Sequence, residues 1–306
     1  MNEIPVEILI LTDGKPGHQH QSEAFAVLRG CRYRLVPVRF RSRVAKALSY
    51  LFDRLGLYFP CLFAAEAPPG TFRAVVAAGS ETYYAARTLS RRLNIPVVAV
   101  MLPKGYRYDF DLIVAQEHDN PPQRDNIVAL PVNLCRVEPQ GIVTAEPGAR
   151  YVSVILGGDN KVFAMDVETV RRELSRLFEL FPDHRFLVTT SRRTPAAVEE
   201  LLADFPFATS IIYSQNPINP IPDFLAMSDY VFISADSTSM ISEAVTFGSA
   251  AVEILPLRIK RQGSKHAALV DHLAVLGCLH VFDGTLGESR RKIDLGEYLK
   301  AGPSCA

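Results

Sequence analysis

Residues 230–249 read YVFISADSTSMISEAVTFGS, and this stretch decides the fold. It begins with Tyr230–Ile233, a short apolar run of strand length. A hydroxyl-rich loop, SADSTS, comes next, and a stretch with helical periodicity follows it. Short runs rich in Val and Ile alternate with helical stretches along most of the chain, as in βα units that feed a parallel sheet buried on both faces. The sequence therefore predicts an α/β fold built from doubly wound parallel sheets.

The chain of 306 residues is long enough for two domains. The stretch RVEPQGIVTAEPGA, residues 136–149, has two prolines and two glycines and little periodicity, which indicates a linker. We therefore predict a Rossmann-like domain over residues 1–140 and a second over residues 141–306. In the first domain the expected strands are Val6–Leu11, Tyr33–Val38, Ala74–Ala78, Val97–Leu102, Leu112–Ala115 and Ile127–Leu130, and the expected helices are His18–Arg29, Arg43–Leu55 and Thr82–Leu93.

The second domain repeats the same alternation of strands and helices. Its longest expected helix runs from Asp166 to Phe181 and carries one apolar stripe, made of Val170, Leu174, Leu177, Phe178 and Phe181. The expected strands are Tyr151–Leu156, Phe186–Thr190, Ser210–Tyr213, Tyr230–Ile233 and Ala251–Leu255, and further helices are expected after Thr194-Pro195, over Pro222–Ser228 and after the SADSTS loop.

Composition excludes several classes of protein. Lys and Arg together number 33, as do Asp and Glu, so no bulk positive charge points to nucleic acid. The cysteines lack metal-type spacing and predict reduced thiols in a cytosolic protein; they are Cys31, Cys61, Cys135, Cys278 and Cys305. The N-terminus carries Glu3 and Glu7 where a signal peptide needs positive charge, and no segment has about 20 consecutive apolar residues. We expect a cytoplasmic protein with no membrane span.

Six polar loops follow predicted strands: residues 13–21, 79–82, 157–161, 191–194, 214–217 and 234–239. Ligands of doubly wound sheets bind outside the carboxyl ends of the strands, where such loops lie. We therefore expect all six loops to face one cleft between the domains, and we expect the site there.

The SADSTS loop favours an anion. A helix that begins near Ser239 presents unpaired N–H groups and the positive end of its dipole, which suits a phosphate or diphosphate. We expect Ser237, Thr238, Ser239 and Met240 at this site, although one of the hydroxyls could instead cap the helix. Glu243 lies four residues after Ser239, one too far for a capping box, so its carboxylate is a candidate for the hydroxyls of a ribose.

Two other loops of the second domain supply candidate ligand-binding residues. In GGDNK, Gly157 and Gly158 allow a close backbone approach and Lys161 supplies a positive charge, although paired glycines are also common in plain turns. In SRRT, Ser191 and Arg192 precede a helix start, and an arginine fork suits phosphate oxygens. No paired acidic motif predicts a metal ion.

In the first domain, the loop DGKPGHQHQ concentrates polar side chains in one turn. His18 near a helix N-terminus is a candidate general base, and Asp13 is the second candidate catalytic residue. A solvated position at the helix start is the alternative for either histidine, and it is favoured for His20. The candidate substrate-binding residues of this domain are Lys15, Gly17 and Gln21 in the same loop and Gly79 and Ser80 in the GSET loop.

Residues 39–63, RFRSRVAKALSYLFDRLGLYFPCLF, interleave basic and apolar side chains. This pattern suits a basic amphipathic segment that lies on an anionic membrane surface. A helix that packs on the sheet with basic ends would give the same pattern, so both interpretations stay open.

The stretches LILTDGKPGHQHQ, VVAAGS, ILGGDNK, LVTTSRRTP, FLAMSDYVFISADSTSMISEA and GSAAVEILP together resemble the "elongated mitochondria" family, a mitochondrial-fission family of bacterial and plant proteins. The resemblance covers about residues 7–283. It implies a fold like that of GT-B glycosyltransferases, with two Rossmann-like domains.

On that resemblance, the second domain would bind a nucleoside diphosphate sugar as co-substrate, with no other cofactor. Gly157, Gly158 and the hydroxyls of residues 237–239 would hold the diphosphate, and Glu243 would hold the ribose. Arg192 or Lys161 would neutralise the leaving group, and His18 would deprotonate the acceptor. The expected function is a metal-independent glycosyltransferase for an envelope or lipid-linked acceptor at the cytoplasmic face of the membrane.

Two alternatives accompany this hypothesis. A non-catalytic scaffold protein could keep the GT-B shell, as the family name suggests. A nucleotide-sugar epimerase ranks last because the chain lacks a GxGxxG fingerprint after the first strand and lacks a Tyr-x3-Lys pair.

Overall fold

The computed structural model describes residues 7–66, 68–261, 265–288 and 290–300, and the chain divides into two compact units. The first unit holds the described residues up to Arg136 together with those from Asp294 onward, and the second runs from Val137 to Ile293. The end of the chain thus returns to the first unit, whereas a simple two-part division would leave it in the second. Val6 and Cys305 lie outside the described residues.

The first unit is built on a six-stranded parallel sheet. The strands lie in the order β2 (Arg32–Pro37), β1 (Glu7–Thr12), β5 (Val75–Ala78), β6 (Val97–Val100), β7 (Leu112–Gln116) and β8 (Ile127–Leu130). The chain moves outward from β1 to β2 and then returns across β1 to β5. The strand order therefore reverses between β1 and β5, and their carboxyl ends form the position where doubly wound sheets bind ligands.

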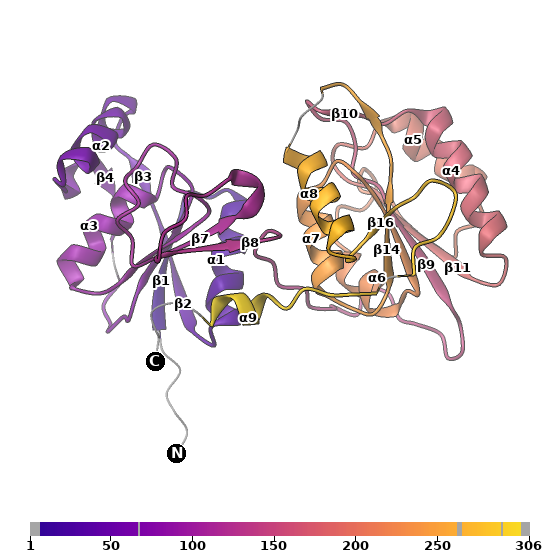
Figure 1. Cartoon of the computed structure of the whole chain (residues 1–306), viewed down its shortest axis with the longest axis horizontal. Helices are drawn as coiled ribbons and strands as arrows, with labels where there is room; N and C mark the ends of the chain where they lie inside the picture. Colours follow the sequence, from indigo (N-terminus) through magenta and orange to yellow (C-terminus); the bar gives the residue numbers. More distant parts are fainter. Residues whose placement is uncertain (1–6, 67, 262–264, 289, 301–306) are drawn as a thin grey trace, which may run out of the picture. The chain divides into compact units, whose positions relative to one another are not determined.

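Helices cover both faces of this sheet. Figure 1 shows α1 (Pro16–Leu28) and α9 (Leu295–Leu299) on one side and α3 (Tyr83–Leu93) on the other. Alternate residues of the strands, such as Leu9 and Leu11 of β1, pack with α3 in one buried cluster. The remaining elements are α2 (Arg43–Leu55), the antiparallel pair β3 (Arg39–Phe40) and β4 (Phe63–Ala64), and the 3-10 turns η1 (Pro60–Leu62) and η2 (Glu117–Asp119).

The second unit repeats this plan with another six-stranded parallel sheet. The strands lie in the order β12 (Thr209–Ile211), β11 (Arg185–Thr189), β9 (Tyr151–Ile155), β13 (Tyr230–Ser234), β14 (Ala251–Leu255) and β16 (His280–Val281). Here the strand order reverses between β9 and β13. The predicted doubly wound parallel fold is confirmed in both units.

Helices also lie on both sides of the second sheet. In Figure 1, α4 (Val167–Leu180) and α5 (Ala196–Leu201) lie on one side, and α7 (Thr238–Thr246) and α8 (Lys265–Val275) lie on the other. The predicted apolar stripe of the long helix is confirmed, because its residues pack with the aromatic side chains of β11 and β13. The remaining elements are α6 (Ile221–Met227), the antiparallel pair β10 (Phe163–Ala164) and β15 (Arg258–Ile259), and the turn η3 (Leu202–Asp204).

A buried carboxylate fixes the start of the second unit. Asp223, in the first turn of α6, is 3% exposed and accepts hydrogen bonds from four consecutive backbone N–H groups, those of residues 140–143, at 2.6–3.1 Å. Burial alone would raise the pKa of Asp223, but the four N–H donors outweigh it and hold that pKa below its usual value. The carboxylate thus ties residues 140–143 to α6.

We expect Asp223→Asn to lower the free energy of unfolding by about 2–3 kcal/mol, because one oxygen becomes an NH₂ group that faces two N–H donors. Urea denaturation of the whole protein measures the change. Asp204→Asn is the matched control: Asp204 pairs with Arg171 at 2.9 Å on the surface, and its replacement is expected to cost less than about 1 kcal/mol. Equal losses in the two variants would contradict the role of the four amides.

Candidate functional site

The second unit has a pocket of about 280 Å³ at the carboxyl edge of its sheet. Three segments line it, and they follow β11, β12 and β13 in turn. The lining residues are Thr189, Thr190, Ser191, Arg192, Tyr213, Pro217, Ile218, Asn219, Pro220, Ile221, Ser237, Ser239, Met240 and Glu243. A pocket in this position is where the fold predicts a ligand.

The N-terminus of α7 forms one wall of this pocket. Ser237 is the N-cap, and its hydroxyl accepts a hydrogen bond from the Met240 N–H at 3.5 Å. The helix therefore begins at Thr238, one residue before the predicted start. Ser239 is exposed and lines the pocket together with Ser237 and Met240, whereas Thr238 is not among the lining residues. One of the three hydroxyls thus caps the helix, which is the alternative to ligand binding that the sequence left open. Ser239 is available to a ligand.

Two lining residues carry charge. Arg192 is exposed at the pocket, and its guanidinium has no hydrogen bond or ion pair within the part of the chain that the structure describes. Glu243, on α7, is half-buried, and its carboxylate is likewise without a polar partner among the described residues. A cation and a carboxylate thus face one pocket without being paired to other groups, which makes both available to a ligand.

Beneath the pocket, a buried polar layer joins the ends of β9 and β13. Asp236 is fully buried, accepts from the Gly158 N–H at 3.0 Å and pairs with Arg193 at 2.8 Å. Ser234 accepts from the Gly157 N–H at 2.7 Å and donates to Asp236 at 2.6 Å. These side chains hold the loops that shape the pocket.

The two predicted glycines belong to this layer. A Cβ at Gly157 would meet the Asp236 carboxylate at 2.3 Å, and one at Gly158 would meet the Arg193 carbonyl oxygen at 2.0 Å. Both glycines are buried, and their N–H groups are already used within the protein. The structure therefore shows a packing reason for the glycine pair, where the sequence suggested an approach to a ligand. Lys161 is exposed and does not line the pocket.

Some lining residues were not predicted. Tyr213 and residues 217–221 supply the apolar side of the pocket, and Asn219 accepts from the Ile221 N–H at 3.2 Å. The sequence predicts that residues 214–217 form a loop at this edge of the sheet, but it gives no candidate ligand-binding residue there. An aromatic residue at the end of a strand followed by a loop with two prolines was the available signal. The hydroxyl of Ser191 donates to the Gly157 carbonyl at 2.6 Å, so it also helps to hold the loop.

Burial raises the pKa of Glu243 to about 7, from an ordinary value of 4.5. Between these two values the folded protein retains a proton that the unfolded chain has released. The folded state therefore loses stability as the pH rises from about 4.5 to 7, and the loss is complete above that window.

We expect Glu243→Gln to be more stable than the native protein by about 1–3 kcal/mol at pH 8 and equally stable at pH 4.5, because the amide carries no charge to desolvate. Thermal unfolding at the two pH values measures this. Glu200→Gln, at an exposed position of α5, is the control and should shift neither curve. A Glu243→Gln variant that is less stable at pH 8 would show that the carboxylate has a partner in the folded protein.

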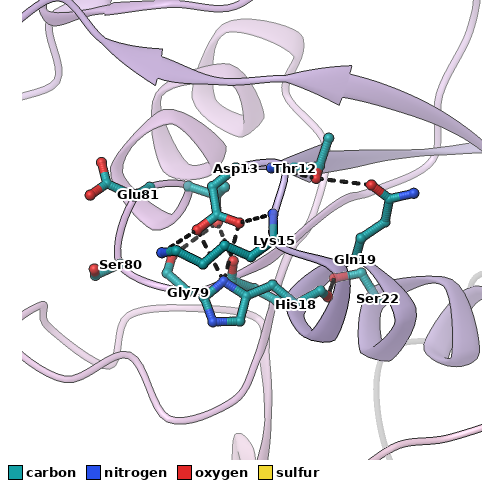
Figure 2. A network of polar contacts seen from close by, with 12 residues as sticks. Thr12, Asp13, Lys15, His18, Gln19, Ser22, Gly79, Ser80 and Glu81 are labelled. Carbon is teal, nitrogen blue, oxygen red and sulfur yellow. Dashed lines mark hydrogen bonds and ion pairs between the residues drawn. The ribbon is translucent and has the colours of Figure 1, made fainter. Parts of the chain in front are cut away.

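The first unit has a second polar cluster, at the carboxyl ends of β1 and β5. Asp13 follows β1, and its side chain is 3% exposed. Figure 2 shows its carboxylate between the Lys15 ammonium, at 2.9 Å, and Nδ1 of His18, at 3.0 Å. Burial alone would raise the pKa of Asp13, but the bonds from Lys15 and the charge of His18 outweigh it and lower that pKa. Asp13 is therefore an ionised carboxylate that orients the His18 ring.

This orientation determines which nitrogen of His18 is available. With Nδ1 held by Asp13, Nε2 is the ring nitrogen left to accept a proton. Gly79, after β5, has φ +87° and packs against the ring so closely that a Cβ would lie 2.4 Å from it. The ring is thus fixed from one side by a carboxylate and from another by a glycine, which is an arrangement suited to a general base.

The rest of the loop after β5 is tied to α2. Lys46 of α2 forms an ion pair with Glu81 and donates to the Ser80 hydroxyl at 3.3 Å. The hydroxyl of Tyr106 donates to the Ser80 carbonyl at 3.0 Å. Glu81 and Lys46 were not among the predicted site residues, because their partners are about 35 positions away in the sequence.

The other predicted residues of the first unit have different surroundings. Gly17 lies in the first turn of α1 with open space around it. Gln21 accepts a hydrogen bond from Gln116 of β7 at 3.0 Å, and His20 is exposed, as expected. Gln19, which was not predicted, bonds to Thr12 at 3.2 Å beside Asp13 (Figure 2). In the described ranges, no group of three or more His, Cys, Asp or Glu side chains could hold a metal ion.

Comparisons with known proteins agree with this architecture. The chain is 23% identical over 337 residues to RP120, an uncharacterized protein of Rickettsia prowazekii (strain Madrid E), and the match covers 92% of each chain. Among solved structures, it is similar to the glycotransferase of kitacinnamycin, with a TM-score of 0.54, 15% identity and coverage of 98% of this chain and 90% of that one.

It is also similar to a proposed UDP-N-acetylglucosamine 2-epimerase from Listeria monocytogenes, with a TM-score of 0.53, 11% identity and coverage of 97% and 86%. At such identities the likeness concerns the fold, which is that of GT-B glycosyltransferases and related enzymes. The model of one family, described as "Mitochondrial fission ELM1", matches residues 16–301, nearly the whole chain; His18 and the pocket of the second unit lie within the match, and Asp13 and Lys15 directly precede it. The protein therefore belongs to the mitochondrial fission ELM1 family.

Proposed function

We propose that this protein is a glycosyltransferase that uses a nucleoside diphosphate sugar. The observation that carries the proposal is the pocket of the second unit, where an unpaired arginine, an unpaired carboxylate and a helix N-terminus face one cavity beside apolar side chains. These are the groups that a nucleoside diphosphate requires: positive charge for the phosphates, an acceptor for the ribose hydroxyls and an apolar surface for the base.

In this proposal each group of the pocket has one task. Arg192, Ser239 and the first N–H groups of α7 bind the diphosphate and neutralise the charge that develops on it as it leaves. Glu243 accepts hydrogen bonds from the ribose, and the aromatic ring of Tyr213 with Ile218 contacts the base. No metal ion or other cofactor is part of the mechanism we propose.

His18 acts on the acceptor. Its Nε2 takes the proton of an acceptor hydroxyl while the oxygen forms a bond to the anomeric carbon of the sugar, and the bond between that carbon and the diphosphate oxygen breaks. Asp13 stabilises the imidazolium that results, as a buried carboxylate at 3.0 Å from Nδ1 can do. The nucleoside diphosphate leaves with both electrons of the broken bond.

We propose that the acceptor is an envelope component or a lipid-linked molecule at the cytoplasmic face of a membrane. In the described residues, no helix has both the length and the apolar character that a bilayer span requires. The support for a membrane acceptor is the surface of α2, which carries exposed apolar side chains and exposed arginines. We do not propose the non-catalytic scaffold, because an ionised Asp13 that orients His18 and a pocket with unpaired charges have no task in it.

An epimerase has to be separated from a transferase by experiment. The chain lacks a GxGxxG fingerprint, but a structure of this same fold is a proposed UDP-N-acetylglucosamine 2-epimerase. The missing fingerprint is therefore no argument against an epimerase with a GT-B-like fold. Incubation with a nucleotide sugar and analysis of the product distinguishes the two, since an epimerase changes the sugar without releasing the nucleotide.

Calorimetry with UDP, GDP, ADP, CDP and dTDP tests the proposal. We expect at least one of them to bind, and we expect Arg192→Ala to weaken that binding by about 10–100-fold, because a charge-assisted contact to phosphate is lost. Arg171→Ala, on the exposed face of α4, is the control and should bind the nucleotide normally. Binding of none of the five nucleotides at millimolar concentration would reject the proposal.

A further inference from the structure

The helix α2 has its polar side turned inward. Its buried residues are Ala45, Ser49 and Asp53, which lie on one face at a spacing of four. Ser49 bonds to the Tyr106 hydroxyl at 3.0 Å, and Asp53 pairs with Arg87 at 2.5 Å. Surface helices of globular proteins usually bury an apolar stripe and expose a polar one. In α2 two of the three buried residues are polar, and the apolar residues on its inner side, Tyr50 and Phe52, are only half-buried against the core.

The apolar side of α2 faces outward. Val44 is 67% exposed, Leu51 is 52% exposed and Leu55 is 63% exposed, and Leu48 between them is half-buried. These positions follow the spacing i, i+4, i+7, i+11 and therefore share one face of the helix.

The chain continues this apolar surface beyond the end of the helix. It turns at Gly56, which has φ +73°, and it adds the exposed side chains of Leu57 and Phe59 directly after the turn. We call the six residues Val44, Leu48, Leu51, Leu55, Leu57 and Phe59 the outward face of α2. Figure 1 shows α2 at the edge of the first unit, next to β3 and β4.

The charges around the outward face have one sign. Arg39, Arg41, Arg43 and Arg54 are exposed, and within the described ranges their guanidinium groups form no hydrogen bond or ion pair. Asp53 is the only acidic residue between positions 39 and 63, and it is fully buried. An apolar face bordered by unpaired arginines is complementary to a surface with an apolar interior and anionic headgroups.

We propose that the outward face of α2 docks on an anionic lipid bilayer, with its apolar side chains in the boundary between headgroups and acyl chains and its four arginines at the headgroups. The helix is too short to span a bilayer, so it lies in the plane of the membrane surface. A protein partner of the same size would offer acidic side chains at fixed positions. Arg43 and Arg54 lie at the two ends of the helix, and Arg39 and Arg41 lie on β3 and in the turn after it. This spread suits the diffuse charge of a membrane better.

The same helix also contacts the loop beside His18. Lys46, on the side of α2 away from the outward face, pairs with Glu81 and bonds to Ser80, and these residues directly follow the glycine that packs on the His18 ring. Because α2 holds this loop through Lys46, a bilayer docked on the outward face would contact the same helix that positions the loop. If the transferase proposal holds, this contact deepens it by placing a membrane-bound acceptor on the same unit as the base; the docking itself does not depend on it.

Vesicle flotation with the full-length protein tests the docking surface. We expect binding to vesicles of phosphatidylcholine with phosphatidylglycerol, little binding to phosphatidylcholine alone, and release at high salt, because exposed charges are screened. Leu51→Glu/Leu55→Glu should lower binding to the anionic vesicles at least tenfold. Arg43→Glu/Arg54→Glu should lower it at least about 25-fold, since each arginine near an anionic surface contributes about fivefold.

Matched controls are available on other surfaces. Val275→Glu changes an apolar side chain of α8 that is 86% exposed, and Arg32→Glu changes an exposed arginine of β2; both variants should bind as the native protein does. Since all substituted positions are exposed, the unfolding temperature of each variant should remain within a few degrees of the native value.

Three results would overturn the inference. The first is absence of binding to anionic vesicles, and the second is equal binding by the native protein and the outward-face variants. The third is a change of oligomeric state in those variants without a change in vesicle binding, because it would show that a second copy covers the face. Calorimetry with nucleotides separates this inference from the proposed function. Vesicle binding without nucleotide binding rejects the transferase alone, and nucleotide binding without vesicle binding rejects the docking surface alone.

Discussion

Replacement of His18 by alanine is expected to lower kcat for glycosyl transfer by about 10²–10⁴-fold, the range for loss of a general base. The affinity for the nucleotide should change by less than about threefold, because the pocket of Arg192 and Glu243 lies in the other unit. The pH dependence that arises from protonation of the base should disappear with the side chain. Steady-state kinetics over a range of pH and calorimetry with the bound nucleotide measure these effects.

Asp13→Asn tests whether His18 needs the Asp13 carboxylate to act as the general base. The amide keeps the size of the side chain but removes the charge that stabilises the imidazolium and fixes the tautomer. We expect a loss of kcat of the same order, again with little change in nucleotide affinity. His20→Ala is the matched control, because His20 lies in the same turn of α1 but is exposed. Activity of His18→Ala within about threefold of the native level would show that another group takes the proton.

The sheets of both units could be predicted because their central strands, such as β5, β7, β9 and β14, are buried on both faces. Such strands are continuous runs of Val, Ile and Ala, and β14 was predicted with the bounds the structure has, as was helix α2. The pairs β3–β4 and β10–β15 were missed. Each strand of these pairs has two residues, and their partners are far apart in sequence, as Arg39 is from Ala64, so no local pattern marks them.

The end of the chain shows another limit of the sequence. The elements α8, β16 and α9 were not predicted, and α9 packs with α1 and β8 of the first unit. The carbonyl of Leu299 in α9 accepts a hydrogen bond from Arg29 at the end of α1. Periodicity is only a weak signal for a helix as short as α9. It also carries no information on which of the two sheets the segment packs against.

The candidate pocket was predicted by position more accurately than by residue. Loops after parallel strands line the pocket, and the predicted residues Arg192 and Glu243 are among its lining residues. The sequence could not show which hydroxyl caps α7, because Ser237, Thr238 and Ser239 are all of residue types that commonly cap helices. Nor could it show that Gly158 is required by the Arg193 carbonyl, since close packing against a ligand and against the protein both require glycine.

For α2, as for the pocket, the sequence pattern alone could not show how the side chains are arranged. Residues 39–63 predicted either a helix packed on the sheet or one exposed to a membrane, and the apolar spacing is the same in both. The difference depends on which side of the helix finds a partner. Asp53 determines which side of α2 packs against the protein, because its partner Arg87 lies on α3, 34 residues further along the chain.

The second large expected effect concerns this ion pair. Asp53 and Arg87 are 0% and 3% exposed, and their contact at 2.5 Å is supported by the Tyr58 hydroxyl at 3.0 Å and by the Arg107 N–H at 2.8 Å. The Arg87 guanidinium also lies over the Tyr58 and Phe110 rings, at 5.0 and 5.4 Å from their centroids. Removal of the arginine therefore leaves a buried carboxylate that keeps two neutral donors but has lost its paired cation.

We expect Arg87→Met to lower the free energy of unfolding by about 3–5 kcal/mol, because methionine retains most of the apolar volume but leaves Asp53 as an unpaired buried charge. Urea denaturation of the whole protein measures the loss, and Arg171→Met, which breaks the exposed pair with Asp204, should cost less than about 1 kcal/mol.

The double variant Asp53→Asn/Arg87→Met separates the pair from the packing around it. It removes both charges together, so it should be more stable than the sum of the two single changes by at least about 1 kcal/mol. Additive losses would mean that Arg87 acts through its aromatic contacts alone. A coupled loss would show that an ion pair holds the polar side of α2 against α3, and this attachment is what leaves the apolar side of the helix facing outward.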